Sequence, residues 1–179
     1  MLDAALDLFA HRTYGATPIP ELATAAGVAA GTIYRYFPSK EALANEVYRE
    51  AKQGLADAIL GDLEPGLSPH EEFERWWGGL VRFARQRPDA FAYLETHCHD
   101  PYLDDESREV AAALDVAAAD FVRRSQRAGM MRSGPPDVLV AMVFGAFVGL
   151  HKHARLRGRA LSRSELDTAR DATWHMVAA

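Results

Sequence analysis

Apolar residues recur at helical spacing along almost the whole chain, and no segment alternates apolar and polar residues as a half-buried strand does. The pattern begins at once, because residues 2–9 carry a single apolar stripe made of Leu2, Ala5, Leu6 and Phe9. Proline and glycine interrupt the pattern at short intervals and mark helix ends. The sequence therefore predicts an all-α fold of about nine helices.

Two very short helices are expected directly after the first one. Thr17 is expected to cap the first of them, with Pro18 and Pro20 in the opening turn, where no backbone N–H is needed. Gly27 suits the turn that ends it, and the second short helix reads AGTIYRYF. Two short helices joined by a glycine turn and packed on a first helix predict a helix-turn-helix.

The second short helix offers side chains that can reach DNA phosphates and base edges. Ser39 is expected to cap the long helix that follows, and Lys40 at its start could hold a phosphate. The net charge of −5 counts against nucleic-acid binding, and the first fifty residues carry four basic and six acidic side chains. Bulk charge does not report which charges face a ligand, so the local motif decides the prediction.

Residues 2–49 resemble the N-terminal domain of the TetR family of repressors. The matching strings are LDAALDLFA, YGAT, ELATAAGV and GTIYRYFPSKEAL. The resemblance implies a helix-turn-helix DNA-binding domain over residues 1–46 and a helical effector-binding and dimerisation domain over 47–179. It implies a cytoplasmic homodimeric regulator, expected to be a repressor, that binds a palindromic double-stranded DNA operator and responds to a small apolar or aromatic effector. No cofactor is expected.

The resemblance also assigns DNA contacts residue by residue. It implies phosphate contacts from Thr17, Tyr34, Tyr36 and Lys40, and base-edge positions for Gly31, Thr32 and Arg35. Three departures from the family pattern lower the expected affinity for DNA. Ala29 and Ala30 stand where polar residues are common, and Pro20 also stands where a polar side chain is common. The sequence also shows no basic arm before the first helix. Two alternatives therefore stay open, a helix-turn-helix used only for packing and a small-molecule-binding protein that has lost DNA binding.

Large aromatic and apolar side chains concentrate in the middle of the chain. They are typical either of a plain core or of the walls of a small-molecule pocket. The candidate wall residues are Phe73, Trp76, Trp77, Leu80, Phe83, Phe91, Leu94 and Phe121. His97 is the expected polar contact of such a pocket.

The run His97-Cys98-His99-Asp100 invites a metal site. Ligands two residues apart do not face each other on a helix, and no second cluster has metal-ligand spacing. We therefore expect no metal, and instead a helix end with one histidine turned inward as a polar anchor. Asp104, Asp105 and Glu106 stand at a helix start, where acids complement the dipole, and no catalytic motif indicates an enzyme.

Residues 137–157 form an almost wholly apolar helix, which suggests burial on most sides. Ala141, Gly145 and Gly149 repeat every four residues along it. The resemblance implies that the last two helices form a dimer interface there, and the alternative is close packing within one chain. We see no stretch of about 18 apolar residues and expect no membrane contact. A basic run from Lys152 to Arg163 is interpreted as a solvated helix end rather than a second nucleic-acid contact.

Overall fold

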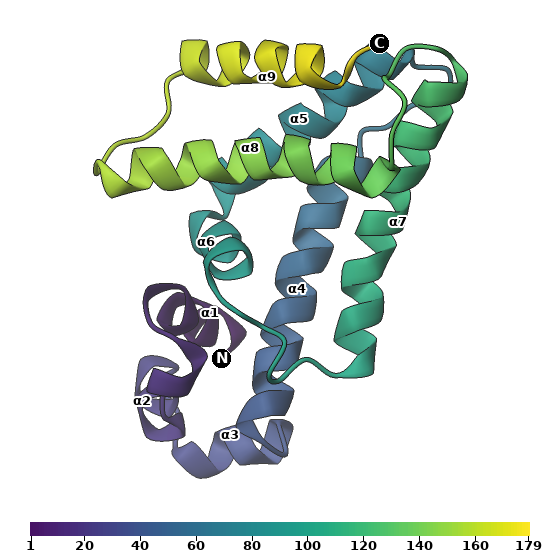
Figure 1. Ribbon diagram of the computed structural model, residues 1–179. Coiled ribbons are helices and arrows are strands. Elements are labelled where there is room, and N and C mark those ends of the chain that lie inside the picture. The colour runs from purple at the N-terminus through teal and green to yellow at the C-terminus, as the bar shows by residue number, and fades with distance from the viewer. The chain divides into compact units, whose positions relative to one another are not determined.

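The computed structural model describes residues 1–179 apart from the side chain of Thr96. Across these described residues the chain forms nine α-helices, one short 3-10 turn and no strand, which confirms the predicted all-α fold (Figure 1). The helices are α1 (Leu2–His11), α2 (Ile19–Ala25), α3 (Ala30–Tyr36), α4 (Lys40–Leu60), α5 (Pro69–Gln86), α6 (Pro88–Thr96), α7 (Asp105–Arg127), α8 (Pro136–Leu156) and α9 (Arg163–Val177), and the 3-10 turn η1 spans Tyr14–Ala16.

The chain divides into two compact units. The first unit is made of Met1–Ala58 and Arg82–Ala112, and the second of Ile59–Val81 and Ala113–Ala179. Helices α4, α5 and α7 each contribute residues to both units. The sequence predicts a different division, into functional domains over residues 1–46 and 47–179. That division stays a prediction.

Serine side chains fix the start of three helices, and the cap at Ser39 confirms the prediction from the sequence. Ser39 Oγ accepts from the backbone N–H of the third residue after it at 3.1 Å, at the start of α4. Ser68 forms a capping box with Glu71 before α5, and Ser162 forms one with Glu165 before α9. Each box satisfies backbone donors that the first helical turn leaves unpaired, so these helix starts are set by local sequence.

The first unit is built around α1, which packs on α6 and on α2. Ala5 and Phe9, both on the predicted stripe, are fully buried. The Phe9 ring stacks on Tyr93 of α6 with centroids 6.0 Å apart and lies 5.9 Å from the ring of Tyr14. Aromatic packing on one face of α1 thus anchors the N-terminal helices to α6.

The second unit holds its helices together through aromatic rings and through an aliphatic cluster of Ala154, Leu161 and Leu166. Trp77 of α5 meets Phe147 of α8 edge-on at 5.2 Å, and Phe73 of α5 lies 5.1 Å from Trp174 of α9. Figure 1 shows α8 and α9 running antiparallel to each other. Helices α5, α8 and α9 therefore share one ring-filled core.

Helix α8 corrects two expectations. Leu139, Phe147 and Ala154 are buried, but the helix as a whole is not, so the expected burial on most sides is wrong. By length and composition α8 could also cross a membrane, with a mean hydropathy of 1.3 over an 18-residue window that is only 17% buried. The expectation that no segment reaches that threshold is therefore wrong, while the absence of membrane contact stays a prediction. The physical reason is that α8 packs along one stripe and leaves the opposite stripe without a neighbour in its own chain.

Candidate nucleic-acid interface and effector site

Helices α2 and α3 form the predicted helix-turn-helix. Gly27 has a φ of +67°, a left-handed conformation that glycine adopts without strain, and it ends α2 as expected. The N–H of Val28 then donates to the carbonyl of Ala23 at 2.9 Å and closes the turn. Leu22 on α2 and Ile33 on α3 are both buried. These contacts fix α3 on α2 and leave its other side open.

Thr17 does not cap α2, so that prediction is wrong. The N-cap is Pro18, whose backbone is extended, and the helix begins one residue later than expected, at Ile19. The Thr17 hydroxyl instead donates to the carbonyl of Thr13 at 3.2 Å, and its side chain is completely buried. The phosphate contact implied for Thr17 stays a prediction, and the surface proposed below does not include this buried residue.

The open side of α3 carries most of the residues expected to contact DNA. Tyr34 and Tyr36 are 54% and 58% exposed, although large aromatic residues are more often partly buried. Arg35 is exposed, donates to the Tyr36 hydroxyl at 3.2 Å and lies over its ring. Gly31 is exposed and Thr32 is half-buried. This surface combines aromatic hydroxyls with a guanidinium, a composition suited to phosphates and base edges.

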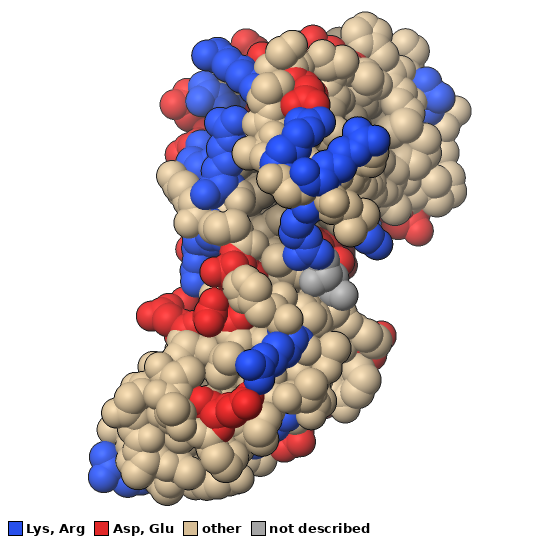
Figure 2. Space-filling model, turned by 90° about the vertical axis from the view of Figure 1, so that its left-hand side faces the viewer, with Lys and Arg blue, Asp and Glu red and all other residues tan. Residues whose placement is uncertain are grey.

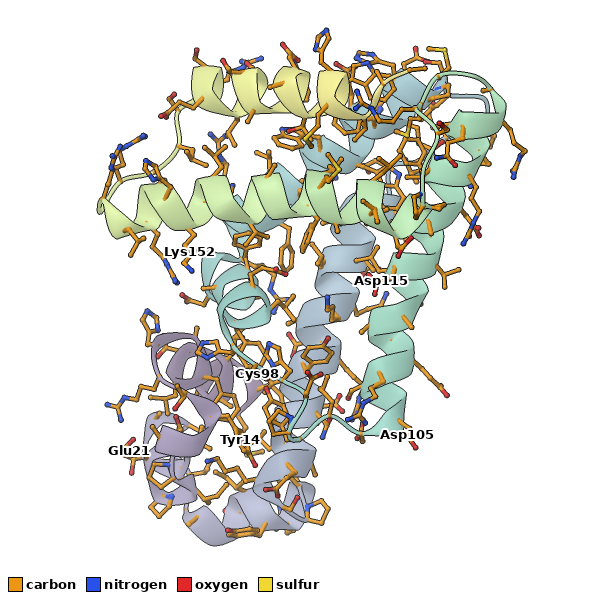
Figure 3. All side chains as sticks on the ribbon, viewed as in Figure 1. Tyr14, Glu21, Cys98, Asp105, Asp115 and Lys152 are labelled. Carbon is orange, nitrogen blue, oxygen red and sulfur yellow. The ribbon has the colours of Figure 1, made fainter. Side chains whose placement is uncertain are left out.

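Lys40, the expected phosphate-binding lysine, bonds within its own chain. Its ammonium donates to the carbonyl of Tyr14 at 2.5 Å and lies 4.2 Å from the centre of that ring. Partial burial lowers the pKa of Lys40 below its usual value. The Tyr14 hydroxyl donates to Glu41 at 2.7 Å, so Tyr14 lies between the end of α1 and the start of α4 (Figure 3). Lys40 therefore links the turn after α1 to α4.

Asn45 on α4 forms a buried junction that the sequence did not reveal. Its side-chain N–H groups donate to the carbonyls of Glu41 at 3.0 Å and Tyr102 at 2.8 Å. Its side-chain oxygen accepts from the N–H of Asp104 at 2.9 Å. A single amide thus joins α4 to the segment before α7. The only sequence signal is one asparagine within the apolar stripe of residues 43–51.

The sequence predicts one inward histidine in this run and names His97 as the polar contact of the pocket, whereas the buried histidine with both ring nitrogens bonded is His99. Its Nε2–H donates to the carbonyl of Tyr93 at 3.0 Å, and its Nδ1 accepts from the Tyr102 hydroxyl at 2.5 Å. Burial lowers the pKa of His99 to about 4, so the ring is neutral at physiological pH. The Tyr93 and Tyr102 hydroxyls bond each other at 2.8 Å. Both nitrogens of His99 are engaged, so a metal could bind this ring only by breaking these bonds.

The residues expected to line an effector pocket fall into two groups. Phe73, Trp76, Trp77, Leu80 and Phe121 belong to the second unit, and Phe83, Phe91, Leu94 and His97 belong to the first. All but Trp76 and His97 are buried. Trp76 stacks on Phe121 with centroids 5.7 Å apart. Trp76 and His97 each hold a buried ring nitrogen that has no hydrogen-bond partner among the described residues. Their role in effector binding stays a prediction.

The small residues of α8 face open space within the chain. Ala141, Gly145 and Gly149 are exposed, and a Cβ added to either glycine would meet nothing within 4 Å. Val138 and Met142 extend the same stripe and are 47% and 38% exposed. The alternative that these small residues serve close packing inside one chain is therefore wrong.

The basic run from Lys152 to Arg163 begins on α8 and lies at the surface. Figure 2 shows Lys and Arg side chains gathered on one face of the molecule. Arg159 pairs with Glu165 at 2.6 Å, which lowers the pKa of that carboxyl to about 2. Lys152, Arg155 and Arg157 are exposed near the end of α8, where cations complement the helix dipole. Our interpretation as a solvated helix end stays a prediction.

Helices α1, α2 and α3 form a three-helix unit in which α3, the second helix of the helix-turn-helix, is exposed. This arrangement, followed by a long helical region, is typical of DNA-binding transcriptional regulators. Residues 1–47 match the profile of the bacterial regulatory proteins of the tetR family, and residues 48–179 match the tetracyclin repressor-like C-terminal domain. The chain therefore belongs to the tetR family, which confirms the resemblance seen in the sequence.

Known relatives agree with this assignment. A repressor of the helix-turn-helix type from Mycobacterium tuberculosis is 27% identical over 145 residues, covering 78% of this chain and 72% of its own. A solved tetR family regulator from Vibrio parahaemolyticus superposes with a TM-score of 0.80 at 25% identity, covering 99% of this chain and 96% of its own. One from Marinobacter aquaeolei reaches 0.86 at 24% identity, covering 99% and 93%. These proteins are named as transcriptional regulators or repressors, not as enzymes.

Proposed function

We propose that the protein is a homodimeric repressor that binds a two-fold symmetric DNA operator and responds to a small apolar effector. The observation that carries the proposal is the open face of α3, where Tyr34, Arg35 and Tyr36 are exposed together. In this arrangement Arg35 reads a base edge while the two tyrosines and Lys40 hold the backbone. Thr32 and Gly31 lie at the start of α3 and face the bases.

The exposed stripe of α8 supports the dimer. An apolar helix with glycines on its open face allows a second helix to approach closely, and two-fold symmetry brings the same stripe from a second copy. Replacing Gly145 by Leu should shift the protein toward monomer in analytical ultracentrifugation. Gly78 on α5 is a matched control, because it is also exposed and has nothing within 4 Å of an added Cβ. If Gly145→Leu and Gly78→Leu sediment alike, α8 is not part of the dimer interface.

The DNA-binding proposal is tested by selecting a binding sequence from random duplexes and measuring affinity as salt rises. Lys40→Ala should weaken binding to selected and random DNA alike and lower the salt slope by about 1. Arg35→Ala should cost about 1–3 kcal/mol on the selected sequence only and relax one base position. Arg85→Ala removes the same charge from an exposed position on α5 and serves as the control. The division of roles is wrong if Lys40→Ala and Arg35→Ala act alike on both DNAs.

A further inference from the structure

Two neighbouring side chains at the end of α3 are held together. Arg35 Nη2 donates to the Tyr36 hydroxyl at 3.2 Å, and the guanidinium carbon lies 5.2 Å from the centre of the Tyr36 ring. Successive residues of a helix point about 100° apart, so neighbouring side chains do not usually meet. The contact therefore requires the long arginine side chain to bend over the ring, whose π face attracts its charge.

The side chains of this pair have no other hydrogen-bond or ion-pair partner among the described residues. Tyr36 is 58% exposed, and Arg35 is exposed beside it. The positive charge of Arg35 is therefore not neutralised within the described chain. A negatively charged surface such as that of DNA can face it directly.

The Tyr36 hydroxyl has one more hydrogen bond to give. It accepts from Arg35, and a guanidinium has no acceptor, so the hydroxyl proton cannot be donated back to it. A DNA phosphate accepts hydrogen bonds, so Tyr36 can donate to a phosphate while it holds Arg35. The neighbouring charge polarises the hydroxyl and strengthens it as a donor.

Arg35 keeps a complete edge for recognition. A guanidinium carries five N–H groups in a rigid fork, with one pair of donors along the Nη1–Nη2 edge and another along the Nε–Nη2 edge. Nη2 contributes a different proton to each pair, so its bond to Tyr36 occupies only one of the two edges. Two parallel donors fit the O6 and N7 acceptors of guanine in the major groove.

The place of Arg35 on α3 makes the direction of this edge matter. In a docked recognition helix the N-terminal residues lie nearest the base edges. Arg35 is the last but one residue of α3, so it reaches a base only through a long side chain held in one direction. An unrestrained arginine samples many rotamers, and fixing one of them before binding removes part of the entropic cost.

We propose that Tyr36 is a positioning residue for Arg35: its hydroxyl and ring hold the guanidinium so that the free edge meets a guanine, while the hydroxyl proton goes to a phosphate. The proposal rests on the proposed DNA binding by α3 and specifies one base of the operator. It also couples a backbone contact to a base contact that would otherwise be independent of it.

Tyr34 supplies a matched control for Tyr36. It is also an exposed tyrosine of α3, at 54%, and its hydroxyl bonds no described residue. The base position read by Arg35 is found first, as the one at which Arg35→Ala loses preference on the selected duplex. Affinities are then measured on four duplexes that differ only at that position. We expect the unaltered protein to prefer guanine there by about 5- to 150-fold.

Tyr36→Phe keeps the ring and removes the hydroxyl. We expect it to weaken binding to all four duplexes and also to lower the guanine preference by roughly 2- to 10-fold. Tyr34→Phe should weaken all four alike and leave the preference unchanged. In the Arg35→Ala background, Tyr36→Phe should no longer alter base preference. The proposal is wrong if the guanine preference survives Tyr36→Phe in full, or if the unaltered protein prefers another base at this position.

A measurement without DNA tests whether the pair exists in solution. The Tyr36 ring should displace the NMR signals of the Arg35 side-chain N–H groups, so these signals should shift in Tyr36→Leu but not in Tyr34→Leu. Signals that do not respond to Tyr36→Leu would show that Tyr36 does not hold Arg35, whatever the protein does with DNA. A protein that binds no duplex at all would instead overturn the proposed function, and this proposal with it.

Discussion

In the first unit, directional bonds from Asn45 join helix α4 to the segment before α7, and the paired hydroxyls of Tyr93 and Tyr102 join α6 to the same segment. In the second unit, the equivalent joints are rings such as Trp77, Phe147 and Trp174. A directional bond depends on one donor and one acceptor, whereas a ring contact depends on the area that the two rings bury. A substitution at a joint therefore removes a directional bond in the first unit and ring packing in the second.

Removing a ring from the second unit should have the largest effect on stability. Phe147 is fully buried, and Phe147→Ala deletes its contact with Trp77 and leaves a cavity. We expect a loss of about 3–5 kcal/mol in the free energy of unfolding, measured by urea denaturation. Val138→Ala on the same helix is the control, because Val138 is exposed. A cost below about 1 kcal/mol for Phe147→Ala would show that rings do not hold this unit.

Breaking the polar junction of the first unit should cost somewhat less. Asn45→Ala leaves the carbonyl of Tyr102 and the N–H of Asp104 without their partner. We expect a loss of about 2–4 kcal/mol, since each unpaired buried group costs about 1–3 kcal/mol. Gln53→Ala removes an exposed amide from the same helix and should change stability by less than about 0.5 kcal/mol. If both variants unfold at the same urea concentration, the junction is not a structural bond.

Local sequence was enough to predict the cap at Ser39 but not this junction. Ser39, Ser68 and Ser162 each bond a backbone group three residues away, so the signal lies within one turn. Asn45 bonds groups 57 and 59 residues away, which no local pattern contains. Local sequence also failed at Thr17. Its position favours a cap for the helix that follows, but its hydroxyl donates to the carbonyl of Thr13 instead.

The candidate site was predictable in part, for a similar reason. The residues of α3 follow from a distinctive run of sequence, and their exposure agrees with it. The sequence predicts an inward histidine in this run. Tertiary packing decides that His99, rather than His97, has both ring nitrogens hydrogen-bonded. The apolar composition of α8 predicts that it is covered, and composition does not say whether its own chain or a second copy covers it.

The neutral histidine of the first unit predicts a dependence of stability on pH. His99 in the folded protein takes a proton only near pH 4, while the unfolded chain takes one near the ordinary value of 6.5. Its contribution is therefore full above pH 6.5 and is lost as pH falls from 6.5 toward 4, by up to about 3 kcal/mol. Urea melts at pH 7.5 and pH 5 should show this loss, and His99→Gln should reduce it. An equal pH dependence in both proteins would mean that another group is responsible.

The smallest expected effect concerns the hydroxyl of Tyr14 in the turn after α1. Tyr14→Phe removes the 2.7 Å bond to Glu41 and keeps the ring that packs on Tyr102. Because Glu41 is exposed and water replaces the lost partner, we expect a cost of about 1 kcal/mol or less by urea denaturation. The same bond is the largest cause of the lowered pKa of Glu41, so that pKa should rise toward its ordinary value in the variant. Carboxylate titration by NMR checks this directly, and an unchanged Glu41 pKa would show that the hydroxyl does not bond this carboxylate in solution.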